Sequence, residues 1–301
     1  MANEPRVPRL LFIDNLRIAL MVLVIAYHVG LAYGPGDWWY FQNPDRSPML
    51  RPFFTVNRAF FMSLFFMISG YFLPASYDRR GAGDFLKDRL LRMGIPLVVF
   101  LLVVIPVIMY AYCLNFRNYD RLPFLVYYWK LYFGWGGRPP GWSGPSWPDM
   151  QLGHLWFVQH LLIFALCYSV WRLIRGPLPG VDREAERLPE NLKIIVFILA
   201  LTAVTFVVRI WYPIYKWTAF LGFIQVSFAD VPRDLSFFII GVIARYRNWF
   251  INMPKSTGIA WLAIGVASAA LCFGLEITGA GCFSAGGANG LSLAHCLWES
   301  L

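Results

Sequence analysis

Asp14, Arg17 and His28 interrupt the first long apolar run of the chain, residues 10–34. About 20 apolar residues suffice for a helix to cross the hydrocarbon of a bilayer. A charged side chain near the centre of such a helix costs at least ~2.5–3.5 kcal/mol, so intramembrane ionisable residues are by default functional or paired. At about 100° per residue all three side chains project from one helical face, with Arg17 and His28 about 16 Å apart along the axis. The pattern predicts a polar stripe used for catalysis or transport.

Histidine is the commonest general base near neutral pH. His28 is therefore a candidate base that removes a proton from an attacking hydroxyl, or an acceptor that carries an acyl group in a two-step transfer. We expect Asp14 and Arg17 to pair, because pairing lowers the cost of burying each charge.

Two further cations, Arg89 and Arg92, open the third apolar run. Residues three apart lie on neighbouring positions of one helical face. Guanidinium groups bind phosphate through paired hydrogen bonds, so the two arginines are a candidate clamp for a phosphorylated cofactor. The plainer alternative is that both arginines anchor the helix on the basic side of the membrane.

His154 and Trp156 open the fourth apolar run, directly after a loop rich in Gly, Pro and Trp. Either they contact a sugar, for which imidazole and aromatic faces are suited, or they anchor the helix at the membrane interface. Ser69 lacks the G-x-S-x-G context of a nucleophile, so we expect it to pack or to line the substrate path. Its neighbour Gly70 indicates the close approach of another helix, and we expect His160 to pack.

Asp230, Arg233 and Asp234 flank a proline at the head of the sixth apolar run. We expect helix capping and interfacial charge there, with Asp234 within reach of the site.

The five cysteines show no CxxC or metal-ligand spacing, and we expect small apolar side chains that fill space in the core. One pairing, Cys282 with Cys296 on the outer side, stays open.

The elements that must position these residues are membrane helices. Hydrophobic residues make up 58% of the 301 residues and charged residues 14%, against about 25% charged in soluble domains. We predict an all-α polytopic membrane bundle of seven to eight transmembrane helices, forming one domain over residues 1–301. The expected spans are 10–33, 54–75, 93–113, 154–173, 192–212, 233–248 and 257–276, with a further one from about 289.

Lys and Arg are concentrated in the segment before the first apolar run and in every second loop after it. Because such basic segments stay on the cytoplasmic side, we predict a multi-pass cell-membrane protein with a cytoplasmic N-terminus. This placement also explains the net charge of +9 without nucleic acid as a partner. We interpret residues 213–229 as interfacial or re-entrant; a span there would invert everything downstream. The last apolar segment is too short to cross a membrane, so we expect either a chain that is incomplete at its C-terminus or a last helix that needs a partner.

Arg17 and His28 with ten residues between them, together with Arg89-x-x-Arg92, resemble the membrane-bound acyltransferase-3 family, in particular its glucan-modifying succinyltransferase branch. Similar stretches surround Ser69-Gly70 and begin at His154 and at Leu235. The resemblance implies about ten helices in the full fold. It also implies transfer of an acyl group, acetyl or succinyl, from cytoplasmic acyl-CoA to an extracytoplasmic glucan or other polysaccharide.

The resemblance implies roles for the residues singled out above. His28, Asp14 and Arg17 would be catalytic, and Arg89 and Arg92 would bind the phosphates of CoA. His154, Trp156 and Ser69 would contact the acceptor, with no metal required. The alternative is a secondary transporter in which Asp14, Arg17 and His28 relay protons or substrate. The sequence leaves the acyl group, the acceptor and the oligomeric state undetermined.

Overall fold

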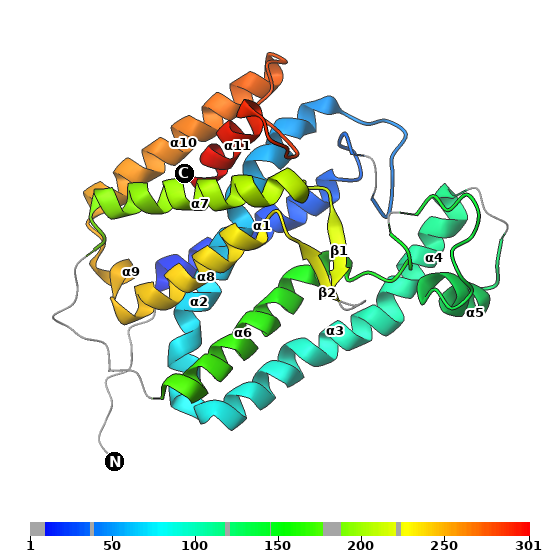
Figure 1. The fold of residues 1–301 in the computed structure, drawn as a ribbon, viewed down its shortest axis with the longest axis horizontal. Coiled ribbons are helices and arrows are strands. Elements are labelled where there is room, and N and C mark those ends of the chain that lie inside the picture. Colours follow the sequence, from blue (N-terminus) through cyan, green and yellow to red (C-terminus); the bar gives the residue numbers. More distant parts are fainter. Residues whose placement is uncertain (1–9, 37–38, 118–120, 145, 177–187, 221–223) are drawn as a thin grey trace.

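The computed structural model describes residues 10–36, 39–117, 121–144, 146–176, 188–220 and 224–301, and most of them are helical. Figure 1 shows long helices that pack along and across one another, with a small hairpin near the middle and a compact lobe around α4 and α5 at one end. The α-helices are α1 (Leu11–Gly30), α2 (Arg51–Arg89), α3 (Ile95–Val99), α4 (Ile105–Phe116), α5 (Phe124–Tyr127), α6 (Trp156–Arg175), α7 (Asn191–Trp211), α8 (Val231–Tyr246), α9 (Trp249–Asn252), α10 (Lys255–Ile277) and α11 (Gly290–Ser300). Shorter helical turns are η1 (Pro48–Leu50), η2 (Leu90–Gly94), η3 (Phe100–Val104), η4 (Tyr128–Tyr132) and η5 (Gly153–Leu155).

Every predicted span coincides with helical structure. Within the described residues, five stretches are long and apolar enough to cross a membrane: Leu11–Gly30, Pro48–Phe116, Gly153–Arg175, Asn191–Trp211 and Lys255–Ile277. α8 is apolar but has only 16 residues. The mostly helical membrane architecture is thus confirmed, while seven to eight crossings stay a prediction.

The stretch Pro48–Phe116 consists of two limbs that meet at a bend near Gly81 (Figure 1). Gly81 has φ 74° and ψ 166°, a backbone conformation open to glycine and strained for other residues. A Cβ at this position would meet nothing within 4 Å. Backbone conformation, and not lack of space, therefore requires glycine here.

α2 and α8 pack with their backbones in contact. A Cβ on Gly70 would lie 2.2 Å from the carbonyl oxygen of Phe238, and a Cβ on Gly241 would lie 2.0 Å from that of Met67. Small residues permit such close packing of membrane helices, where dispersion contacts replace the hydrophobic effect as the driving force. The close approach predicted from Gly70 is confirmed.

Residues 213–229 contain a β-hairpin in place of a helix. Strands β1 (Trp217–Phe220) and β2 (Ile224–Ser227) pair antiparallel, with Trp217 opposite Ser227. The backbone N–H of Gln225 donates to Oε1 of Gln159 on α6 at 3.1 Å, which holds β2 against that helix. Strands this short do not cross a membrane, which agrees with the prediction that residues 213–229 do not form a span. The all-α prediction, however, did not include this two-stranded sheet.

A buried ion pair fixes the connection that leads toward α6. Two nitrogens of Arg117 donate to the two carboxylate oxygens of Asp149 at 2.9 and 2.7 Å, and the Tyr127 hydroxyl adds a third bond at 2.5 Å. Both charged side chains are almost completely buried. The loop is therefore anchored just before residue His154.

A disulfide joins Cys272, near the end of α10, to Cys282 in the following loop. Cys296 is buried and carries a free thiol. The pairing of Cys282 with Cys296 that the sequence left open is therefore wrong.

Candidate active site

The rings of His28 and His154 lie in contact, with centroids 4.4 Å apart and planes inclined by 36°. His28 occupies the last turn of α1, and His154 lies in η5, the single turn that leads into α6. The helical periodicity of each segment predicts its own polar face but not which segments become neighbours. The sequence accordingly suggested a base and a sugar contact separately, and the structure brings them together.

The surroundings of His28 select its tautomer. Its Nδ1 lies 2.7 Å from the carbonyl oxygen of Val24, one turn earlier in α1. A carbonyl only accepts hydrogen bonds, so Nδ1 of the neutral ring carries the proton and Nε2 carries the lone pair. This is the form that a general base requires.

Aromatic side chains surround part of the histidine pair. The Trp39 ring lies 5.6 Å from that of His28 and 5.0 Å from that of His154, and Tyr40 stacks on His154 at 5.7 Å. Burial, with a smaller contribution from the charge on Asp149, raises the pKa of the Tyr40 hydroxyl above its usual value. Tyr40 therefore stays protonated beside His154 and cannot serve as a base near neutral pH.

Gly153 allows Tyr40 to approach this closely. A Cβ on Gly153 would lie 2.2 Å from the Tyr40 hydroxyl oxygen and 3.2 Å from Cδ1 of Ile105. Its φ of 51° also falls in the left-handed region. Glycine at this position thus sets both the backbone and the packing immediately before His154.

Trp156 continues the aromatic wall toward the hairpin. Its ring lies 5.5 Å from that of Trp217 on β1 and 5.4 Å from that of His160. His160 is buried and its Nδ1 lies 2.7 Å from the Trp156 carbonyl oxygen, so its predicted packing role is confirmed. Ser69 is partly buried in α2, one residue before Gly70.

Asp14 and Arg17 lie in and near the first turn of α1, at the opposite end from His28. Their charged groups approach to 4.0 Å, and the side chains are 30% and 55% exposed. The predicted pairing is confirmed. Neither side chain reaches the histidine pair. Asp14 and Arg17 therefore cannot contact a group that reacts at His28.

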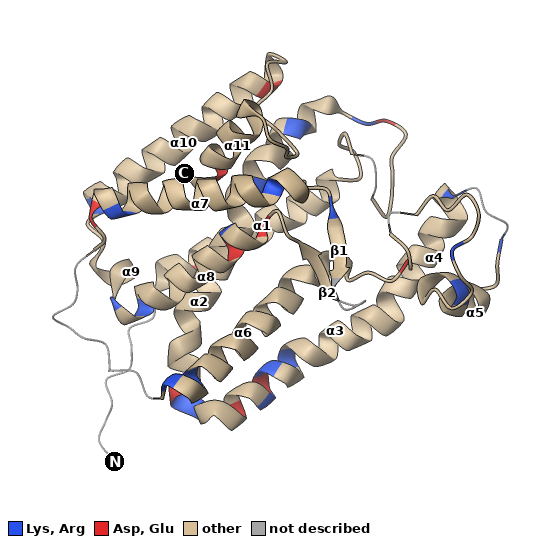
Figure 2. Cartoon of the chain, viewed as in Figure 1, with Lys and Arg blue, Asp and Glu red and all other residues tan. Residues whose placement is uncertain are grey.

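Arg89 and Arg92 lie where α2 leads into η2. Arg92 Nε contacts Asp88 Oδ1 at 2.7 Å, and Arg80 contacts the other oxygen of the same carboxylate. The Arg89 guanidinium lies 5.0 Å from the centre of the Phe85 ring, and its buried Nε has no hydrogen-bond partner among the described residues. Figure 2 shows Lys and Arg gathered at this corner, where α6 also ends.

The profile of a family described as acyltransferase domain matches residues 10–297. This chain belongs to the acyltransferase-3 family. Curated relatives of this acyltransferase-3 chain include glucans biosynthesis protein C from Escherichia coli strains K12, SMS-3-5 and O139:H28, each 28% identical over 241 residues. The match covers 77% of this chain and 57% of each relative, so the chain spans little more than half their length. No solved structure matches it.

The acyltransferase-3 chain also contains a buried ionic cluster, centred on Asp230 and Glu299. Asp230 is bound by Arg58 of α2 at 2.7 Å, by Arg209 of α7 at 3.4 Å and by Arg233 of α8 at 3.2 Å. Glu299 of α11 binds Arg209 at 2.5 Å and Arg233 at 3.0 Å. Four helices therefore meet at one network of charges.

This cluster corrects the expectation for residues 230–234. The Asp230 side chain makes no capping hydrogen bond to α8, because its oxygens are taken by arginines and by the Ser227 hydroxyl at 2.8 Å. Asp234 is buried and accepts from the Ser63 hydroxyl at 3.3 Å. A sequence signal existed, since Arg58 and Arg209 lie inside apolar runs, where a charge predicts a partner.

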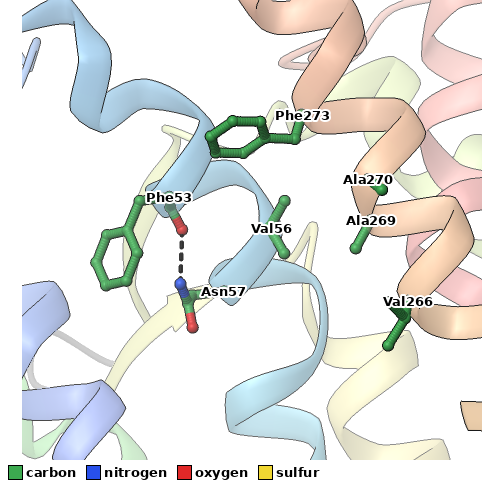
Figure 3. A pocket seen from close by; sticks show the side chains of 7 residues that line it. All are labelled: Phe53, Val56, Asn57, Val266, Ala269, Ala270 and Phe273. Atoms are coloured by element: carbon green, nitrogen blue, oxygen red, sulfur yellow. Dashed lines mark hydrogen bonds between the residues drawn. The ribbon is translucent and has the colours of Figure 1, made fainter.

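Between α2 and α10 of the acyltransferase-3 domain lies an open apolar groove of about 470 Å³ (Figure 3). Its lining residues are Phe53, Val56, Asn57, Val266, Ala269, Ala270 and Phe273. Nδ2 of Asn57 donates to the Phe53 carbonyl oxygen at 2.8 Å. None of these described lining residues is ionisable, so they offer no acid–base chemistry.

Proposed function

We propose that this chain is an integral-membrane O-acyltransferase that moves an acetyl or succinyl group from acyl-CoA to a carbohydrate hydroxyl. The observation that carries the proposal is the contact of His28 and His154, with Nε2 of His28 left as the basic nitrogen. Family membership gives the reaction class, and the relatives' name, glucans biosynthesis protein C, favours a glucan as acceptor.

In the proposed reaction, Nε2 of His28 takes the proton of the acceptor hydroxyl while the hydroxyl oxygen attacks the thioester carbonyl. The new C–O ester bond forms and the C–S bond breaks. The imidazolium then returns its proton to the departing thiolate, and the products are an acyl ester and CoA. A two-step route, in which Nε2 first accepts the acyl group, uses the same nitrogen.

The second imidazole, that of His154, is placed to orient the hydroxyl or to share its proton. Trp39 and Tyr40 offer aromatic faces against which a sugar ring can pack. Trp156 extends this surface, and we assign Ser69 to the substrate path on the strength of the family resemblance alone.

We assign the donor to the opposite end of the bundle. Arg89 and Arg92 lie at a corner rich in Lys and Arg (Figure 2), where phosphate groups of acyl-CoA would be attracted. Asp14 and Arg17 lie at the start of α1 and would hold that helix or the donor in place. With this end in the cytoplasm, the thioester would reach His28 along the bundle and the acceptor would arrive from outside.

The test is acyl-CoA binding and CoA release by the full-length protein, with acetyl-CoA and succinyl-CoA as probes. We expect His28→Ala to bind the donor and to produce no ester. We expect the double variant Arg89→Ala/Arg92→Ala to lose donor binding. A wild-type protein that neither binds nor consumes either probe would refute the proposal, and substrate flux without an acylated product would favour transport.

A further inference from the structure

The bend at Gly81 brings together two residues that a straight helix would separate. Arg80 and Asp88 would lie about 12 Å apart along the axis of a continuous α-helix. In the structure Arg80 Nη1 contacts Asp88 Oδ2 directly. The bend therefore folds the end of α2 back so that this carboxylate meets a guanidinium group from before the bend.

Asp88 uses both of its oxygens in this arrangement. Oδ2 contacts Arg80, and Oδ1 contacts Nε of Arg92 at 2.7 Å. Arg89 adds a third guanidinium, packed over the ring of Phe85, and its buried Nε has no hydrogen-bond partner among the described residues. Two guanidinium groups thus contact one carboxylate and the charge of a third acts on it, so these four side chains carry two positive charges in excess.

Guanidinium groups bind carboxylate and phosphate through the same pair of N–H directions. The Asp88 side chain therefore occupies positions that phosphate oxygens would take between Arg80 and Arg92. With Asp88 displaced, a phosphate with two negative charges would also neutralise more of the three guanidinium charges than the single carboxylate does.

We propose that Asp88 is a built-in competitor for the phosphate groups of acyl-CoA, with Arg80 as an additional phosphate-binding residue. Asp88 holds the two arginines in the unliganded protein and is displaced when a phosphate binds. The competition weakens donor binding and helps the product CoA to leave. This inference rests on the proposed function, because it concerns the donor site named there.

The test compares dissociation constants for CoA and acetyl-CoA by calorimetry, in nanodiscs of phosphatidylcholine so that anionic lipids do not compete. Asp88→Asn removes the competing charge, and we expect binding about 1.4- to fivefold tighter, the range of an exposed ion pair. Asp84→Asn is the matched control, since it removes the same charge from an exposed position four residues earlier. We expect its effect to be much smaller.

Arg80→Gln tests whether Asp88 competes with phosphate or whether the Arg80–Asp88 ion pair only stabilises the fold. It breaks the same Arg80–Asp88 contact, but we expect it to weaken CoA binding because a phosphate ligand is lost. If Asp88→Asn weakens binding as Arg80→Gln does, or matches Asp84→Asn, the proposal is wrong. If Asp88→Asn does not fold, a structure of the wild type with CoA decides: Asp88 still bridging both arginines would overturn it.

The proposed function can fail separately. A wild-type protein that binds no CoA refutes the acyltransferase assignment, and inorganic pyrophosphate is then the probe of the arginine site. Tighter binding of pyrophosphate by Asp88→Asn than by Asp84→Asn would support the competition; equal binding would refute it.

Discussion

The imidazole of His28 lies against that of His154, 4.4 Å between ring centroids, although one ends α1 and the other precedes α6. The pair combines a base of fixed tautomer with a second ionisable ring walled by Trp39 and Tyr40. The chemistry of the site therefore depends on how two helix ends are held together, and the predictions below test the rings and their supports.

Replacing His28 by Gln removes the basic nitrogen while keeping a polar side chain. We expect the rate of ester formation to fall by about 10²–10⁴-fold, the usual contribution of a general base. Binding of acetyl-CoA should stay within about twofold of wild type, since the arginine corner is remote. His160→Gln is the control, because His160 makes the same Nδ1–carbonyl contact without facing His28. Equal rates for the two variants would exclude His28 as the base.

Replacing His154 by Phe keeps an aromatic ring against Tyr40 but removes both nitrogens. We expect the thermal midpoint in detergent to change little and ester formation to fall by at least about tenfold, because acid–base groups act through their nitrogens. The acceptor KM and kcat should be measured separately. Wild-type activity in this variant would show that His154 contributes only packing.

Gly153→Ala introduces a Cβ 2.2 Å from the Tyr40 hydroxyl oxygen, at a φ of 51°. Overpacking and left-handed backbone strain each cost about 1–3 kcal/mol. We expect a lower thermal midpoint and lost activity through displacement of His154. The double variant Gly153→Ala/Tyr40→Phe removes the clashing oxygen and should recover part of the midpoint; no recovery would show that backbone strain dominates.

Gly70→Ala and Gly241→Ala each place a methyl group within 2.2 Å of a backbone carbonyl oxygen on the facing helix. Backbone atoms cannot rotate away, so α2 and α8 must separate, and we expect a loss of stability of about 3 kcal/mol or more. Gly265→Ala in α10 is the matched control, since its Cβ would meet nothing within 4 Å. It should be neutral or stabilising by about 0.5–1 kcal/mol. Similar unfolding midpoints for all three would refute the close contact.

Glu299→Gln leaves Arg209 and Arg233 without their shared carboxylate in a buried site. Removing one partner of a buried ion pair costs about 3–5 kcal/mol, because the remaining charge stays desolvated. The exposed pair of Glu190 with Lys193 provides the comparison, and Glu190→Gln should cost at most about 1 kcal/mol. Unfolding midpoints in detergent measure both; equal losses would mean that the cluster is accessible to water.

The sequence predicted helices better than contacts. Apart from α2, which continues to Arg89 where the predicted span ended at residue 75, runs of apolar residues located the long helices to within a few residues, because about 20 such residues have few alternatives in a bilayer. The β1–β2 hairpin was not predicted, since a short run of mixed apolar residues fits strand, helix or interfacial segment equally well. The disulfide partner of Cys282 depends on where α10 ends in space, which spacing alone does not give.

For the candidate site, too, the sequence predicted single residues better than their contacts. His28, His154 and Arg89 were singled out by chemistry, because polar groups in apolar runs are costly without a purpose. Their neighbours were not: Tyr40 beside His154 and Asp88 between two arginines depend on tertiary packing. The role of Asp230 was misjudged because a capping position explained it locally, whereas its partners lie on three other elements.

The disulfide between Cys272 and Cys282 predicts which side of the membrane this part of the molecule faces, on the ground of redox chemistry and independently of the positions of Lys and Arg. Phe273, next to Cys272, lines the same groove as Phe53 at the start of α2. Phe54 in turn lies close to the end of α1 that carries His28, since a Cβ on Gly30 would lie 3.0 Å from its ring. Disulfides persist in oxidising compartments and are reduced in the cytosol. We therefore expect the histidine pair to lie toward the oxidising face. The measurement is thiol labelling of intact cells, after mild reduction, with a reagent that cannot cross the membrane. Labelling of Cys272 or Cys282 under these conditions would confirm the expectation.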